Sequence, residues 1–398
     1  MANESSAGGI SSFETLDRSI VKKLLKSLTI VEDPRKPRGK RHALINVLAV
    51  AVLGFMSGCD NAEALEDWGQ KEADWLSGFL HLPYGTPSQD VFLRVFASIK
   101  PEQFQEAFVT WAHELMAHMG LSQQIAIDGQ TNKGSRQRRI KVAPIHMVSA
   151  LACGEGLVLG QVKTAEKSNE IKAIPNLLNM LNIQGSLVTI DAMGCQVSIA
   201  RQITKGGGDY LLGLKGNQGT LHENVKKLFE TTELPEYQDM KSDLVQQASE
   251  HNTGHGREEL RRARIIHDFD ELIPSVQRWP ELKSLVAIDS ERTEAVSAKK
   301  SIETRYYISS KNLTPEQAIR GTRQHWAIEN KLHWVLDVSF GQDANQTRVR
   351  YAAENLAVVR HFALNIIRNY TGDKLSVPRR RRLCDYKIDY REKMLGLR

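Results

Sequence analysis

The sequence predicts an α/β protein in which a mixed β-sheet follows an all-helical N-terminal domain. Up to about residue 120, apolar residues recur at the three- and four-residue spacing of amphipathic helices. After residue 124, short runs rich in β-branched residues begin, and two of them are joined by a Gly-Glu-Gly connection typical of an antiparallel hairpin. Beyond residue 185, strand-like runs alternate with helical ones, as in parallel strands joined by helical crossovers. Both kinds of strand pairing are therefore expected in one sheet.

The helical domain is predicted over residues 13–120, after a polar, Gly/Ser-rich stretch at residues 1–12 that we expect to be disordered. Its first helix carries an apolar stripe made of Phe13, Leu16, Ile20, Leu24 and Leu28. Local Pro and Gly punctuation predicts further helices at about 42–57, 61–80, 88–99 and 102–119. No recognition helix is identifiable, so a DNA-end-binding module and a plain helical cap remain equally open.

The α/β region is predicted over residues 121–370. Strands are expected at about 125–128, 143–153, 157–164, 186–190 and 210–215, and helices at about 168–182, 195–204 and 219–230. Residues 232–312 interrupt this rhythm and predict a β-rich insertion, with strands near 259–267, 283–289 and 304–310. Thr314 followed by Pro315 then predicts a helix start, with that helix running to about residue 338 and a last helix at about 349–370.

Composition and charge narrow the function classes. The most apolar run, residues 43–56, is too short to span a bilayer, and no signal peptide is evident. The four cysteines are far apart and form no metal-ligand spacing, which indicates a reduced, cytoplasmic protein. The net charge is +6, and the predicted C-terminal tail, residues 371–398, is basic: residues 374–398 hold nine Lys/Arg against three Asp/Glu. Such a tail fits a polyanionic partner, or it is simply solvated.

Three acids are the candidate chemical centre. Asp128 and Asp191 each follow a buried strand-like run, and Glu329 lies on the predicted helix between His325 and His333. Carboxylates at the ends of neighbouring strands can converge, and Mg²⁺ prefers carboxylate oxygens. Strand-end aspartates also commonly cap turns, and the helix could simply be amphipathic. A His/Glu zinc or iron site is a sharper rival, but the spacing differs from HExxH and no second His/Glu set is present.

Several long strings resemble the DDE transposases of the ISAs-type insertion sequences, the branch that includes the H-repeat-associated proteins. They read IAIDGQT, HMVSALAC, LVLGQVKT, EKSNEIKAIPNLL, VTIDAMGCQ, GGDYLLGLKGNQ and HWAIENKLHWVLDVSF, within a resemblance over about residues 13–370. The resemblance implies an RNase H-like catalytic domain with a β insertion. It also implies that Asp128, Asp191 and Glu329 form a triad holding two Mg²⁺ ions, for which Mn²⁺ can substitute.

The same resemblance implies cleavage and strand transfer of insertion-sequence ends. The partners would be double-stranded DNA, as terminal inverted repeats and target, and a second copy of the chain when two ends are synapsed. The sequence departs from the family pattern at two places. Gln130 stands where members usually have Lys, and His325 stands where the wider group tends to have Arg. Neither departure changes a predicted metal ligand.

Candidate DNA contacts are basic or polar residues near the predicted site. Residues 133–141 contain five basic residues and no acid, and Lys133, Arg136, Arg138 and Arg139 among them are expected, with the tail, to neutralise phosphates. The other candidates are Lys215, Asn217, His255, Arg257 and His325. Lys215 and Asn217 could equally form a simple turn, and His255 and Arg257 a simple hairpin.

Two other functions remain open. One is an RNase H-like, structure-specific nuclease or resolvase, and the other is a catalytically silent DNA-binding protein derived from a transposase.

Overall fold

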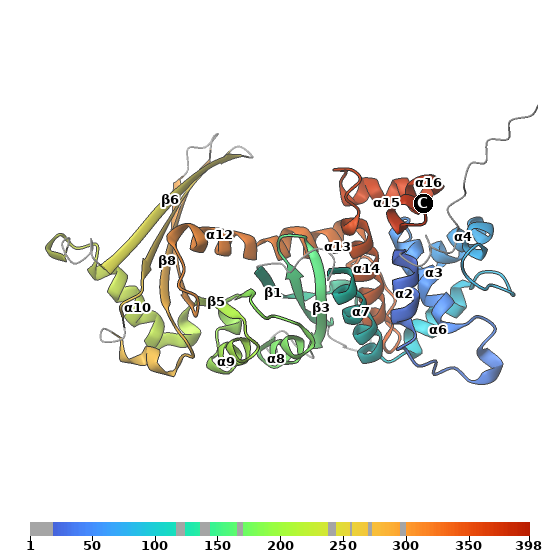
Figure 1. Ribbon diagram of the computed structural model, residues 1–398, viewed down its shortest axis with the longest axis horizontal. Helices are drawn as coiled ribbons and strands as arrows, with labels where there is room; N and C mark the ends of the chain where they lie inside the picture. The colour runs from blue at the N-terminus through green and yellow to red at the C-terminus, as the bar shows by residue number, and fades with distance from the viewer. Residues whose placement is uncertain are drawn as a thin grey trace, which may run out of the picture.

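The computed structural model describes residues 19–116, 124–135, 144–164, 170–237, 244–254, 257–269, 273–294 and 300–398. The molecule is elongated, with the insertion at one end, the first five strands in the middle and the N-terminal helices at the other end (Figure 1). No helix among the described residues is long and apolar enough to cross a membrane. The expectation for residues 1–12 lies outside the described part of the chain.

The N-terminal region is helical, as expected. Its helices are α2 (Ile20–Leu28), α3 (Leu44–Met56), α4 (Ala62–Lys71), α5 (Ala73–Ser77), α6 (Gln89–Ser98) and α7 (Pro101–Met116). The single helix expected at 61–80 is two helices that meet at Glu72. Helix α14 (Ala352–Asn369) packs against α3, α6 and α7. The Asn355 amide on α14 donates to the carbonyls of Phe96 and Ile99, so the last long helix shares a core with the first ones.

The middle of the molecule is a mixed sheet whose first five strands follow the order β3-β2-β1-β4-β5. These strands are β1 (Gln124–Thr131), β2 (His146–Ala152), β3 (Leu157–Thr164), β4 (Leu187–Ile190) and β5 (Asp209–Leu214). Strands β1, β2 and β3 pair antiparallel, whereas β4 is parallel to both β1 and β5. This is the arrangement expected of an RNase H-like domain. Helices α8 (Glu170–Met180) and α9 (Val197–Lys205) pack against this sheet.

Strand β1 is longer than predicted. The sequence suggested a break at Gly129, but the strand continues to Thr131 because Gly129 pairs with Val148 of β2 and Thr131 with His146. The parallel pairing with β4 does end near the expected place, since its last pair is Ile127 with Ile190. Asp128 therefore lies just beyond the parallel β1–β4 pairing but within the antiparallel β1–β2 pairing.

The insertion extends the same sheet to nine strands. Strand β9 (Lys300–Ser309) pairs antiparallel with β5, followed outward by β8 (Ser284–Glu294), β7 (Arg257–Ile266) and β6 (Val245–Gly254). The sequence did not predict β6, whose polar residues are mostly exposed. Helix α10 (Gly219–Thr231) packs against β9, and α12 (Pro315–His325) packs against β1, β4, β6 and β7. One continuous sheet thus connects the insertion to the predicted acids.

The helix predicted from Thr314 to about residue 338 is present but not uniform. It begins with a capping box between Thr314 and Gln317, as α12. A π-helical segment, η8 (Ile328–His333), follows, and α13 (Trp334–Ser339) completes it. π-Helical turns occur mostly as local bulges and are frequent at functional sites. Glu329 lies on this segment.

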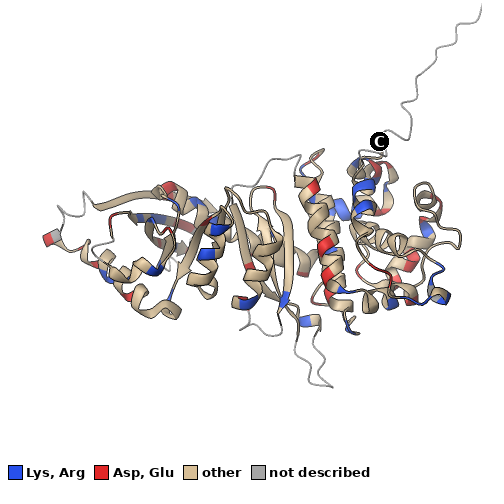
Figure 2. Cartoon of the chain, turned by 60° about the horizontal axis from the view of Figure 1, so that its bottom comes forward, with Lys and Arg blue, Asp and Glu red and all other residues tan. Residues whose placement is uncertain are grey.

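The segment predicted as a basic C-terminal tail, which was expected either to bind a polyanionic partner or to be solvated, is folded against the rest of the chain. It forms α15 (Val377–Tyr386) and α16 (Ile388–Leu395), which pack on each other and on α14. Arg380, Arg381 and Arg391 are buried, so these three side chains do not provide the phosphate contacts expected of the tail. Figure 2 shows that acidic and basic residues alternate along the chain at this end of the molecule.

These three arginines are bound inside the protein. Arg391 pairs with Glu72, and its guanidinium carbon lies 3.9 Å from the ring centre of Trp75. Arg381 pairs with Asp60 at 2.8 Å and donates to the carbonyl oxygens of Phe55 and Cys59, each at 3.0 Å. Arg380 pairs with Asp373 at 3.0 Å and donates to the carbonyl oxygens of Ile367 and Tyr370. Their positive charges tie the C-terminal helices to the rest of the fold.

Candidate active site

The parallel pairing of β1 with β4 brings two of the predicted acids together. Ile127 and Ile190 are the last partners in this register, so the next residues of the two strands, Asp128 and Asp191, lie side by side. The Asp191 carboxylate accepts a hydrogen bond from the Met193 backbone N–H at 3.0 Å, which holds the turn after β4. Turn capping and convergence on one site, which the sequence left as alternatives, therefore occur together at Asp191.

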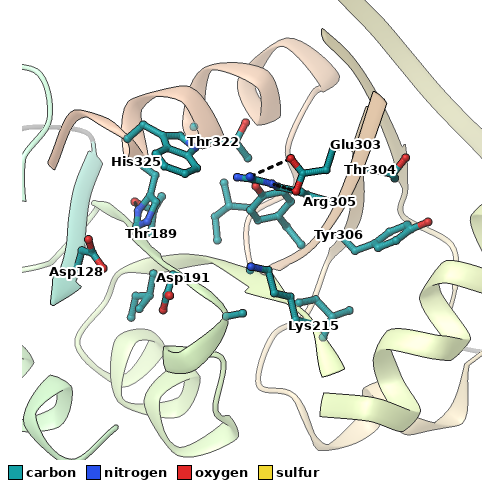
Figure 3. A pocket seen from close by; sticks show the side chains of 18 of the residues that line it. Asp128, Thr189, Asp191, Lys215, Glu303, Thr304, Arg305, Tyr306, Thr322 and His325 are labelled. Carbon is teal, nitrogen blue, oxygen red and sulfur yellow. Dashed lines mark hydrogen bonds and ion pairs between the residues drawn. The ribbon is translucent and has the colours of Figure 1, made fainter. Parts of the chain in front are cut away.

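A cavity of about 250 Å³ contains all three predicted acids in its lining. Asp128 and Asp191 reach it from neighbouring strands, and Glu329 reaches it from the π-helical segment η8. In Figure 3, His325 lies beside the two aspartates, whereas Lys215 and the Glu303–Arg305 pair occupy the opposite side. The β9 residues 303–307 form that opposite wall, a contribution of the insertion that the sequence did not predict.

The π-helical segment changes the expected arrangement around Glu329. The side chain of Glu329 is exposed, and His325 lines the same cavity with its Nδ1 3.0 Å from Thr189 Oγ1. His333 lies outside the cavity lining, is only 9% exposed, and places Nδ1 3.7 Å from Asp128 Oδ2. A regular helix would place the two histidines on either side of Glu329 along one face, and that prediction holds for His325 but not for His333.

Contacts to the β2–β3 hairpin hold the segment that carries Glu329. Lys331 Nζ donates to the Cys153 carbonyl at 3.1 Å, and the Arg368 guanidinium on α14 donates to the carbonyl oxygens of Lys331 and Gly156. Lys331 and Arg368 therefore position the segment that carries Glu329, and neither of these two side chains lines the cavity.

The electrostatics of the cavity disfavour the ionised form of Asp128. Burial, together with the nearby charges of Asp191, Glu170 and Glu329, raises the pKa of Asp128 to about 7 although the Gly129 backbone N–H opposes the shift. Burial lowers the pKa of His333 to about 4, and it also lowers the pKa of His325. Burial therefore favours the uncharged form of both histidines, which weakens their ability to balance the acids.

The donor set suits a hard divalent cation. Three carboxylates around one cavity supply oxygen ligands of the kind that Mg²⁺ and Mn²⁺ prefer, and a cation would relieve their mutual repulsion. No group of three His, Cys, Asp or Glu side chains in the described ranges is close enough to form a ready-made ligand cluster. Binding would therefore draw the carboxylates together. The zinc or iron alternative gains no support, because one ring nitrogen of His325 is already paired with Thr189 and His333 lies outside the cavity.

Two buried residues next to Asp128 were missed from the sequence. His146 Nε2 and Glu170 Oε1 are 2.6 Å apart, and His146 Nδ1 is 2.9 Å from Thr131 Oγ1. A Cβ atom on Gly129 would meet Glu170 Oε1 at 2.4 Å and His146 Nε2 at 2.5 Å, so glycine is required there by close approach. In the sequence, Glu170 resembles an ordinary first-turn acid and His146 an ordinary strand residue, so spacing alone carried no signal.

The predicted DNA contacts have different surroundings. Lys215 lines the cavity and is exposed. The side chain of Asn217 donates to the Ala192 carbonyl at 2.6 Å, which favours its turn role. Lys133 is exposed, and its Nζ is 3.6 Å from Asp343 Oδ2. His325 is a cavity residue. Of the remaining candidates, Arg136, Arg138, Arg139 and His255 lie outside the described residues, and Arg257 is described only as the first residue of β7.

The chain matches two protein-family models and is similar to several known proteins. The family model described as "Transposase DDE domain" matches residues 119–366, and one described as "DDE_Tnp_1-associated" matches residues 25–112. The chain is 38% identical over 381 residues to "Putative protein YbfL" and to "H repeat-associated putative transposase YhhI", both of Escherichia coli (strain K12). Each of these alignments covers 94% of this chain and 98% of the relative.

A solved structure described as a piggyBac transposase synaptic complex with hairpin DNA matches at a TM-score of 0.39 and 11% identity. The match covers 96% of this chain and 80% of that one. This likeness is too weak to support an argument about the site.

Proposed function

The chain belongs to the DDE transposases, in the branch of the H-repeat-associated proteins, and we propose that it cleaves and rejoins DNA with Asp128, Asp191 and Glu329 as its metal-binding triad. The observation that carries this proposal is the single cavity lined by all three acids, two of them side by side at the end of the β1–β4 pairing. The raised pKa of Asp128 supports it, because that carboxylate lies in a site that favours a cation.

The reaction is a pair of phosphoryl transfers. In the first, a water oxygen attacks phosphorus at the end of the element, the bond from phosphorus to the 3′-oxygen breaks, and a 3′-hydroxyl and a 5′-phosphate result. In the second, that 3′-hydroxyl attacks a phosphodiester of the target DNA and displaces its 3′-oxygen. Two divalent ions, when bound, supply the Lewis acidity that activates the attacking oxygen and stabilises the leaving one.

The residues of the chain position the DNA for these steps. Lys215 and Arg305 on the wall opposite the acids attract the scissile phosphate towards the cavity. Neutral His325 and His333 leave the acids free to hold cations rather than binding them in ion pairs. We expect double-stranded DNA as the partner, as terminal inverted repeats and as target, and a homodimer when two ends are held together.

The test is nicking of a supercoiled plasmid that carries the gene's own flanking DNA, with Mg²⁺ or Mn²⁺. Asp191→Asn is expected to lower the nicking rate at least about 100-fold, since it removes a predicted ligand of the metal centre. Asp90→Asn, an exposed aspartate on α6, is the matched control and is expected to nick like the wild type. Equal nicking by wild type and Asp191→Asn would remove the triad from the proposal.

Mapping the products separates strand transfer from simple nuclease activity. Cuts at inverted repeats together with joined products support transposition. Cuts at branched DNA without joining support the resolvase alternative. Metal-independent binding with no cleavage supports the silent DNA-binding alternative.

A further inference from the structure

The catalytic cavity adjoins a second hollow, on the insertion, that the proposed chemistry does not use. This hollow has a volume of about 400 Å³, and its lining includes Arg261, Arg292, Arg305, Arg323 and Trp326. We call it the arginine hollow. Arg305 and Trp326 line both spaces, and the Arg305 guanidinium carbon lies 5.1 Å from the ring centre of Trp326. A strand lying in the cavity could therefore continue into the hollow past these two side chains.

Strand register explains why the arginines gather on one face. In the antiparallel insertion, Arg261 is opposite Ser290, Arg292 is opposite Glu259, and Arg305 is opposite Ile288, so all three arginines point to the same side of the sheet. Nearer β5, that side carries Ala263, Val286 and Ile288, which form an apolar cluster with residues of α12. Near the C-terminal end of α12, the same face of the sheet carries Arg261, Arg292 and Arg305, which line the arginine hollow together with Arg323 and Trp326.

The acids near these arginines occupy only part of their hydrogen-bonding capacity. Arg261 and Arg292 both contact the same oxygen of Glu259, at 2.8 Å and 2.9 Å. Arg305 pairs with Glu303 and Arg323 with Glu250. A guanidinium presents five donors in a planar fork, so one shared carboxylate oxygen leaves room for a further anion. Burial lowers the pKa of Arg261; the charge of Glu259 opposes this shift, and the neighbouring charges of Arg323 and Arg292 add to it.

The opposite face of the same strands provides a contrast. Arg264 is buried and contacts both Asp289, at 3.1 Å, and Glu233, at 3.0 Å. Arg262 shares the same two acids, at 3.1 Å and 3.7 Å. There, two arginines are matched by two carboxylates. Around the arginine hollow, four arginines share three carboxylates, those of Glu259, Glu303 and Glu250, so one positive charge is in excess.

We propose that the arginine hollow binds the phosphate backbone of the DNA strand that runs out of the catalytic cavity. This inference rests on the proposed function, because it requires DNA in that cavity. Planar guanidinium groups suit bidentate contacts with phosphate oxygens. The Arg323–Glu250 pair is exposed on both sides, and exposed ion pairs are weak, so a phosphate can replace this carboxylate. The contacts are to the backbone and therefore independent of base sequence.

The experiment is fluorescence anisotropy of a labelled duplex that carries the gene's flanking DNA, measured in EDTA over a range of salt concentrations. Arg261→Gln with Arg292→Gln is expected to lower affinity at least about 10-fold and to reduce the slope of log affinity against log salt by about 2, one for each phosphate contact. The control is Arg262→Gln, which removes one positive charge from the opposite face of β7. It is expected to keep the wild-type slope.

A double variant with the same slope and affinity as Arg262→Gln overturns the inference. Arg323→Gln, whose side chain is 41% exposed on α12, provides a second variant that leaves the sheet intact and should reduce the slope by about 1. Replacement of both strand arginines by Lys, which retains the charge, should restore most of the slope.

The two proposals fail separately. If Asp191→Asn abolishes metal-dependent nicking but the arginine variants keep the wild-type salt slope, the proposed function is supported. The inference that the arginine hollow binds DNA is then wrong. If the arginine variants reduce the salt slope but the wild type does not nick DNA, the DNA contact in the hollow is supported. The proposal of catalytic cleavage is then wrong.

Discussion

The C-terminal helices and the candidate catalytic cavity with its adjoining arginine hollow are both rich in charged residues. The two regions differ in how completely these charges are paired within the chain. In α15 and α16, Arg380, Arg381 and Arg391 are buried against carboxylates and backbone carbonyls of the same chain. In the cavity, three acids lie near two histidines whose pKa values are lowered by burial, and around the hollow four arginines share three carboxylates. Charge is matched in the first region and left in surplus in the second.

The difference shows that a basic run in a sequence does not by itself indicate a nucleic-acid contact. The C-terminal segment holds nine Lys/Arg against three Asp/Glu, yet three of its arginines are buried within the fold. The arginines of the hollow are spread over three strands and a helix, and no run in the sequence marks them. Surplus charge of one sign after folding, rather than charge along the chain, indicates where a charged partner binds.

The largest expected effect tests the matched region. Arg391→Met should lower the free energy of unfolding by about 3–5 kcal/mol, because the buried Glu72 would keep only the more distant Lys71 Nζ, at 3.7 Å, as a charged partner. Adding Glu72→Leu should recover much of that loss, since two apolar side chains then replace the pair. Urea denaturation measures both variants. Arg382→Gln, an exposed neighbour on α15, is the control and should change stability by less than about 0.5 kcal/mol.

If Arg391→Met instead left stability unchanged and weakened DNA binding, the C-terminal helices would be a DNA surface. The contrast between the two regions would then disappear.

A smaller effect of opposite sign is expected in the cavity. Asp128→Asn should raise the free energy of unfolding by roughly 2 kcal/mol at pH 8 without metal, while abolishing nicking. The pKa of Asp128 is raised in the folded protein to about 7, so the wild type loses stability as pH rises from about 4 to about 7. The uncharged amide does not titrate, and the advantage of the variant should vanish below pH 4. Urea denaturation at several pH values measures it, with Asp90→Asn as the reference.

Metal binding provides the next smaller effect. A divalent ion at ten times its dissociation constant should stabilise the wild type by about 1.4 kcal/mol, because it binds only the folded triad. Mn²⁺ and Mg²⁺ are compared by thermal unfolding with and without EDTA. If the ion stabilises Asp191→Asn as much as the wild type, the ion binds outside the predicted triad. The cavity would then have no metal-binding property that the rest of the surface lacks.

The smallest stability effect concerns the wall opposite the acids. Lys215→Gln should change stability by less than about 0.5 kcal/mol, since this residue is exposed on the cavity rim. Its DNA-binding slope against salt should fall by about 1. Asn217→Ala should show the reverse pattern, a small loss of stability with an unchanged slope, because its amide holds the Ala192 carbonyl. Equal slopes in the two variants would contradict this division of roles.

Much of the fold was predictable because it depends on residues close together in the chain. Local Pro and Gly punctuation predicted the bounds of α3 and α6 to within two residues, β-prone residues predicted β3, and Thr314 with Pro315 marked the start of α12. Strand β6 was missed because neither face of it is apolar enough to reveal a period of two. The π-helical turn at Glu329 was also beyond prediction, since its carbonyl contacts come from Arg368, which is distant in sequence.

The sequence by itself determined the helical and strand segments, the order of the fold and, through resemblance, the three candidate acids. Only the tertiary structure decided which charges meet. It paired Arg391 with Glu72, placed Glu170 and His146 beside Gly129, and brought β9 against β5 so that Arg305 faces the acids. The physical reason is that backbone conformation responds mainly to neighbouring residues, whereas a side chain's burial and partners arise from packing between segments far apart in the chain.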